Sequence, residues 1–161
     1  LDKLHEGKIQ DWEEMIDTNV KGLLYVSREV IPLMVKRNKG HIINIGSIAG
    51  HEVYPKGNVY CASKHAVDAI TKGMRMDLAD TNILVTTIDP GLVETEFSIV
   101  RFHGDAAKAK AVYTGIIPLT PADVADAILY AASTPENVVV AEMILLANKQ
   151  ASSMVVHRTA G

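Results

Sequence analysis

Apolar positions recur along the chain with two different periods, and segments of the two kinds alternate. Three short runs are almost continuously apolar and predict buried strands near 41–46, 83–88 and 140–146. Apolar residues at helical spacing predict a long helix over 11–37 and a second helix over 59–79. Strands and helices in this alternation predict an α/β fold with a parallel sheet that is covered on both faces.

Local signals set the expected ends of the remaining elements. Asp11 is the expected N-cap of the long helix, and Pro32 is expected to bend that helix or loosen one turn. Thr120 is the expected cap of a third helix, with proline at its first position. Residues 91–119 are predicted to be loop with a short helical piece near 105–113, and 147–161 are predicted to be a tail.

Composition excludes several classes of function. The 161 residues are 48% hydrophobic and 22% charged, which suits one globular domain. A net charge of −3 gives no electrostatic reason to expect a nucleic acid or an anionic membrane as partner, and no apolar run approaches the roughly 20 residues that span a bilayer. Cys61 is the single cysteine, so we expect no internal disulfide and a cytoplasmic, reducing environment. The six histidines show no metal-ligand spacing, so no metal is expected.

Tyr60 and Lys64 stand four residues apart in the predicted helix 59–79. Residues at this spacing share one face of a helix, so the phenol and the ammonium can meet at one site. A free tyrosine has a pKa of about 10, and a nearby cation moves it toward use as a general acid or base at neutral pH. The alternative is a surface pair, which is the usual meaning of an isolated Tyr-x-x-x-Lys.

Three further segments extend this pair into a larger pattern. Ser47 follows the predicted strand 41–46, at the end where open α/β sheets place ligands. Asn19 lies in the predicted long helix, where its alternative role is to cap or kink that helix. Pro90-Gly91 follows a predicted strand, where the alternative role is a simple turn. The joint occurrence of the four segments favours a catalytic site over these separate structural roles.

At these residues the chain resembles the short-chain dehydrogenase/reductase family. Asn19, Ser47, Tyr60 and Lys64 fall on the family's catalytic tetrad. The family's cofactor-closing loop is matched by the run that contains Pro90, Gly91, Val93 and Thr95. The resemblance implies a Rossmann-like doubly wound parallel sheet, of which this chain is the C-terminal portion.

The resemblance also implies an activity, which is hydride transfer between NADP, with NAD as the alternative, and a small hydroxy acid or carbonyl compound. Tyr60 would exchange a proton with the substrate oxygen, and Lys64 would lower the pKa of that tyrosine and bind the nicotinamide ribose. Ser47 would hold the substrate oxygen. Asn19 would anchor a water that connects Lys64 to solvent. The residues implied in cofactor binding are Tyr60, Lys64, Pro90, Gly91, Val93 and Thr95.

Three segments are similar to bacterial NADP-dependent 3-hydroxy acid dehydrogenases of the serine type, namely 11–19, 41–47 and 95–102. The last segment favours a hydroxy acid over the ketones, sugars or steroids of other family members. It also contains Arg101, which could bind a substrate carboxylate beside Ser47 and Tyr60. Arg101 could equally be a surface residue or pair with Asp105. A binding module that has lost its chemistry, and a structural module without a ligand, are the further alternatives.

Two features of the whole chain complete these expectations. The family's glycine-rich turn and its Asn-Asn-Ala-Gly segment do not occur, and the sequence starts with Leu1. We therefore interpret residues 1–161 as the catalytic C-terminal portion of a single domain without its N-terminal phosphate-binding half, and expect an open sheet edge at 41–46. The helices 11–37 and 59–79 carry apolar residues on more than one face, and in the resembling family they form subunit interfaces. A homotetramer or homodimer is expected.

Overall fold

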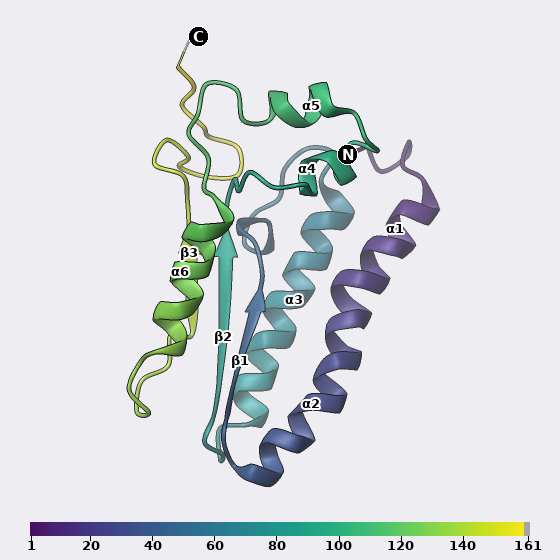
Figure 1. Ribbon diagram of the computed structural model, residues 1–161. Coiled ribbons are helices and arrows are strands. Elements are labelled where there is room, and N and C mark those ends of the chain that lie inside the picture. Colours follow the sequence, from purple (N-terminus) through teal and green to yellow (C-terminus); the bar gives the residue numbers. More distant parts are fainter. Residues whose placement is uncertain (160–161) are drawn as a thin grey trace.

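A parallel three-stranded sheet with strand order β1-β2-β3 forms the centre of the molecule in the computed structural model, which describes residues 1–159 (Figure 1). The strands are β1 (Gly40–Ile45), β2 (Ile83–Pro90) and β3 (Glu142–Leu145). The predicted α/β fold with a parallel sheet is confirmed. The third strand is shorter than the predicted 140–146, because only residues 142–145 pair with β2.

Helices cover both faces of this sheet. On one face lie a long rod and the helix α3 (Asn58–Asp77), which runs beside it (Figure 1). On the other face lies α6 (Pro121–Ala132), whose first turn is closed by a capping box between Thr120 and Asp123. The rod consists of α1 (Ile9–Ile16), the π-helical turn η1 (Asp17–Gly22) and α2 (Leu23–Arg37). The short helices are η2 (Ile48–Gly50), α4 (Phe97–Arg101) and α5 (Ala106–Ala111).

The central strand β2 separates two apolar clusters. Val85 faces Met74 and Leu78 at the α3 side, whereas Ile88 packs against Ala127 and Ala131 of α6. Val85 and Ile88 are 1% and 0% exposed. A strand that is buried on both faces carries apolar residues on both, which explains why its sequence reads as a continuous run.

The long rod differs from its prediction at two points. It begins at Ile9 with Lys8 as N-cap and no side-chain cap, so the prediction that Asp11 is the cap was wrong. Asp11 lies in the first helical turn, where its carboxylate meets the positive end of the helix dipole. The irregular turn is η1, well before Pro32, and α2 continues through that proline.

The segment 147–159 packs against the body of the protein, unlike the predicted tail; residues 160–161 lie outside the described residues. Ser153 donates its backbone N–H to Glu52 Oε2 at 2.7 Å, and Thr159 donates to the Gly115 carbonyl at 2.9 Å. Single-sequence periodicity carries no signal for such contacts, because their partners are distant in sequence.

The outer side of β1 is an edge of the described sheet. Only β2 pairs with β1 in residues 1–159, and Ile45 at its end is 45% exposed. A pocket of about 350 Å³ lies along this edge between β1 and the rod. No helix within the described part of the chain is both long and apolar enough to cross a membrane.

Candidate active site

Ser47 lies directly after β1 and is buried. Its Oγ caps η2 by accepting the Ala49 N–H at 3.1 Å and donates to the Pro90 carbonyl at 3.4 Å. Since Pro90 ends β2, this hydroxyl links the carboxyl ends of two neighbouring parallel strands. The prediction that Ser47 lies at the carboxyl end of a strand is confirmed.

Tyr60 and Lys64 lie on successive turns at the start of α3, next to Ser47. Tyr60 lies near Ser47, and the Ser47 hydroxyl acts to lower the pKa of the Tyr60 phenol. Lys64 Nζ lies 6.0 Å from the centre of the Tyr60 ring and donates to the Ile45 carbonyl at 3.0 Å. The structure therefore brings Ser47, Tyr60 and Lys64 together at the carboxyl end of β1.

Burial opposes the ionised form of both residues. It raises the pKa of Tyr60, while the Ser47 hydroxyl and the positive charge of Arg101 act in the lowering direction. Burial also lowers the pKa of Lys64, and the negative charge of Asp89 acts in the raising direction. The cation that acts against this rise in the Tyr60 pKa is therefore Arg101. The Lys64 ammonium points instead to the carbonyl of Ile45.

Asn19 lies in the widened turn η1 and reaches α3. Its Nδ2 donates to Ser63 Oγ at 3.0 Å, and Ser63 Oγ donates to the Tyr60 carbonyl at 2.8 Å. Asn19 is therefore connected to the helix turn that carries Tyr60, and makes no direct bond with Lys64. Widened turns of this kind are frequent at functional sites.

The loop after β2 is fixed by close backbone contacts. Gly91 donates its N–H to the Leu145 carbonyl at 2.7 Å, and a Cβ at this position would lie 2.2 Å from Gln150 Oε1. A side chain at this position would displace Gln150 Oε1, which accepts the Leu92 N–H at 2.9 Å. Val93 accepts a bond from the Tyr113 hydroxyl at 2.9 Å, and the exposed Thr95 accepts the Phe97 N–H at 3.2 Å.

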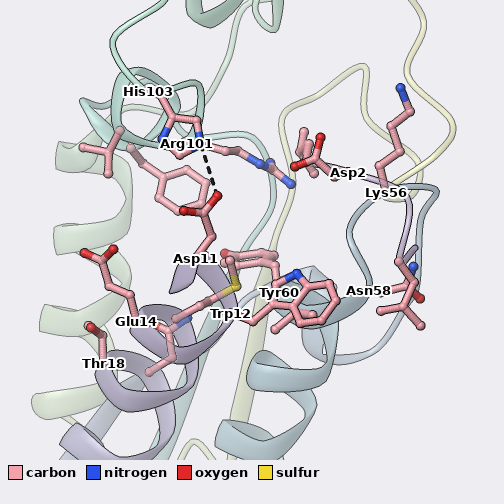
Figure 2. Close-up of a pocket in the computed structure, with 17 residues that line it drawn as sticks. Asp2, Asp11, Trp12, Glu14, Thr18, Lys56, Asn58, Tyr60, Arg101 and His103 are labelled. Carbon is pink, nitrogen blue, oxygen red and sulfur yellow. Dashed lines mark ion pairs between the residues drawn. The ribbon is translucent and has the colours of Figure 1, made fainter. Parts of the chain in front are cut away.

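A pocket of about 400 Å³ opens beside Tyr60 (Figure 2). Its walls come from α1, the start of α3, α4 and the first residues of the chain. Tyr60, Asn19 and Arg101 all line it, so the phenol is accessible from a cavity large enough for a small molecule. His103 and Asp11 form an ion pair of 3.3 Å across its rim.

Arg101 is held over aromatic rings at this pocket. Its guanidinium carbon lies 5.4 Å from the ring centres of Tyr54 and Tyr60 and 5.6 Å from that of Phe97. It also donates a hydrogen bond to the Tyr54 hydroxyl. Burial raises the pKa of Tyr54 to about 12, so this phenol stays neutral. Asp105, the alternative partner in the sequence analysis, pairs with Lys108 at 3.0 Å instead.

Sequence reasoning missed Tyr54 and one charged cluster. Tyr54 stands in an irregular loop, where no periodicity marks a functional tyrosine. His51, Asp89 and Glu142 each offer an atom within 4.8 Å of the others, although the histidine spacing suggested no such group. The only available signal was that Asp89 is a charged residue at the end of an apolar run.

The sequence pattern of the family described as short chain dehydrogenase matches residues 1–105. The chain belongs to this family. Among its short chain dehydrogenase relatives, an NADP-dependent 3-hydroxy acid dehydrogenase of Schizosaccharomyces pombe is 46% identical over 157 residues, which are 98% of this chain and 61% of the relative. The NADP-dependent 3-hydroxy acid dehydrogenase YdfG of Escherichia coli (strain K12) is 50% identical over 139 residues, 86% of this chain and 56% of that enzyme.

Solved structures of short chain dehydrogenases show the same fold. A closed form of serine dehydrogenase complexed with NADP⁺ superimposes with a TM-score of 0.93 at 46% identity, over 98% of this chain and 64% of that one. Serine dehydrogenase from Escherichia coli gives a TM-score of 0.74 at 40% identity, over 89% of this chain and 56% of that one. The chain therefore spans between one half and two thirds of these relatives.

Proposed function

We propose that these residues carry the catalytic part of an NADP-dependent dehydrogenase that acts on small hydroxy acids. The observation that carries this proposal is the group of Ser47, Tyr60 and Lys64 at the carboxyl end of β1, where Tyr60 faces a pocket. The relatives in fission yeast and Escherichia coli are NADP-dependent 3-hydroxy acid dehydrogenases, which supports the same chemistry.

In the proposed reaction, Tyr60 takes the proton from the substrate hydroxyl as a general base and returns it in the reverse direction. Ser47, which lies near Tyr60, holds the substrate oxygen while the charge on that oxygen changes. Lys64 supplies positive charge beside the phenol. Asn19 orders the helix turn below Tyr60 and holds a water that leads from Lys64 to solvent.

NADP, when bound, supplies the acceptor for the hydride that leaves the substrate carbon. The donor chemistry of the site suits the nicotinamide half of this molecule, since a tyrosine hydroxyl, an ammonium and the loop after β2 meet at one sheet edge. We assign the ribose to Tyr60 and Lys64. The cofactor-closing loop is assigned to Pro90, Gly91, Val93 and Thr95.

We further propose that residues 1–161 complete a single Rossmann-like domain together with an N-terminal phosphate-binding half. The open edge of β1 supports this proposal, because parallel sheets are normally flanked by further strands. A cytoplasmic location is part of the same proposal, supported by the single buried Cys61.

Assembly into a homotetramer or homodimer is proposed from the surface of α2. Large apolar side chains stand exposed along it: Tyr25 is 67%, Val26 63% and Leu33 66% exposed. A run of this kind on a helix surface is typical of an interface. Light scattering of the complete enzyme at micromolar concentration should give the mass of an oligomer, and a monomer would refute this part.

Arg101 is proposed to bind the carboxylate of the substrate. The cation lines the pocket next to Tyr60 and is positioned by Tyr54. In the complete enzyme, Arg101→Ala should raise KM for 3-hydroxy acids by about 10- to 100-fold, since a charge-assisted hydrogen bond contributes roughly 1.5–3 kcal/mol. The KM for neutral alcohols should change far less.

Two variants control the Arg101 measurement. Arg37→Ala removes an exposed arginine at the far end of α2 and should leave both KM values unchanged. Tyr54→Phe removes only the hydroxyl that accepts the Arg101 bond and should raise the hydroxy-acid KM by a smaller factor. Equal effects of Arg101→Ala on charged and neutral substrates would count against carboxylate binding.

The proposed function is tested by steady-state turnover of the complete enzyme with NADP⁺ and a series of small 3-hydroxy acids, beside neutral alcohols and sugars. Turnover that is best with hydroxy acids supports it. Best turnover with neutral substrates would favour a broader ketone, sugar or steroid reductase. Fluorescence titration with NADPH that shows binding without any turnover would favour a binding module.

A further inference from the structure

Asp89 is a buried carboxylate behind the candidate active site. It is 1% exposed and lies at the end of β2, directly before Pro90. The Thr87 hydroxyl donates to Asp89 Oδ1 at 2.8 Å, and His51 Nε2 lies 3.1 Å from Oδ2. No step of the proposed reaction uses this group, although burial of a carboxylate is costly.

The Asp89 carboxylate packs against the turn that carries the catalytic residues. A Cβ at Gly46 would lie 1.8 Å from Asp89 Oδ1, so the carboxylate touches the backbone of Gly46 itself. Gly46 stands between Ile45, whose carbonyl accepts the Lys64 ammonium, and Ser47, whose hydroxyl donates to the Pro90 carbonyl. The carboxylate is therefore next to the point where the Lys64 ammonium is held.

Other charged groups face Asp89 from the elements packed around it. His51 Nδ1 lies 3.7 Å from Glu142 Oε1 on β3, so the imidazole stands between two carboxylates. Lys72 of α3 pairs with Asp68 at 2.8 Å and with Glu142 at 3.6 Å. Lys72 thus pairs with Glu142, whereas the basic side chains that face Asp89 are His51 and Lys64.

We propose that Asp89, oriented by Thr87 and His51, is a positioning residue that keeps Lys64 in its ammonium form at the end of β1. Burial lowers the pKa of Lys64, and the Asp89 charge acts against that change. Without it, the buried lysine would lose its proton at a lower pH. The proposal rests on the proposed function for its meaning in catalysis, but its electrostatic part can be measured without turnover.

The test is an NMR titration of the Lys64 side chain in the complete protein carrying ¹³C-labelled lysine. Asp89→Asn removes the charge and keeps the shape, and should lower the pKa of Lys64 by about one unit, the scale on which a neighbouring opposite charge acts. Asp89→Ser removes the same charge with a smaller side chain and serves if the asparagine variant does not fold. Glu142→Gln is the matched control, since it changes a carboxylate of the same cluster that does not touch Gly46.

The pH profile of hydroxy-acid oxidation provides the second readout. Its alkaline limb, where Lys64 loses its proton, should move to lower pH in Asp89→Asn and stay in place in Glu142→Gln. A change in the Lys64 pKa below about 0.3 unit, which is less than 0.5 kcal/mol, would overturn the inference and leave the proposed function intact. An equal change in Glu142→Gln would also overturn it. Absence of turnover in the wild type would overturn the proposed function. The NMR titration would still decide whether Asp89 keeps Lys64 in its ammonium form.

Discussion

Tyr60→Phe is expected to remove nearly all turnover of the complete enzyme while cofactor affinity remains largely intact. The ring of residue 60 keeps its contact with the Phe97 ring, whose centre is 5.5 Å away, so packing is preserved. What is lost is the hydroxyl to which the proposed reaction assigns the substrate proton. General acid/base catalysis contributes about 10²–10⁴-fold, and kcat should fall by that order.

Tyr130→Phe is the matched control for this prediction. It removes a phenol hydroxyl from the 61% exposed Tyr130 on α6, away from the pocket, and should leave kcat unchanged. The measurements are steady-state kcat and fluorescence titration with NADPH for both variants. Retention by Tyr60→Phe of more than about a tenth of the wild-type rate would show that another group carries the proton.

Residues 1–161 expressed alone should be poorly soluble, bind NADPH weakly or not at all, and turn nothing over. Within residues 1–159 no strand pairs with the outer edge of β1, and Ile45 and the 350 Å³ pocket beside it add apolar surface. The chain also carries no glycine-rich turn of the G-x-G-x-x-G type, which cradles dinucleotide phosphates at a helix N-terminus.

This expectation is measured by a dehydrogenase assay on the purified 161-residue chain beside the complete protein, at equal concentrations. Sedimentation of the short chain reports its aggregation in the same samples. Turnover by the short chain comparable to that of the complete protein would mean that the phosphate-binding part of the site lies within these residues after all.

The regular elements and the main site residues could be predicted because their signals are local. The strands at 41–46 and 83–88 are continuous apolar runs, and β1 and β2 form there within a residue or two. Tyr60 and Lys64 share a helix face by spacing alone, and Ser47 follows a strand directly. In a parallel sheet, the carboxyl ends of all strands lie on the same side, so residues that follow different strands come together there.

The features that could not be predicted depend on contacts between distant segments. The π-helical turn η1 forms where Asn19 reaches Ser63 on α3, a contact between residues 44 apart in sequence. Tyr54 meets Arg101 only because α4 folds back over α3. The orientation of the Lys64 ammonium toward Ile45, and the partners of Asp89, are likewise set by tertiary packing.

The proposed function is measured most directly by the initial rate of NADP⁺ reduction by the complete enzyme, followed by absorbance, with a small 3-hydroxy acid as substrate and NAD⁺ in a parallel series. We expect substrate-dependent formation of NADPH, a lower rate with NAD⁺, and loss of the signal in Tyr60→Phe. Absence of any hydroxy-acid-dependent reduction of either cofactor, in a protein that binds NADPH, would contradict it.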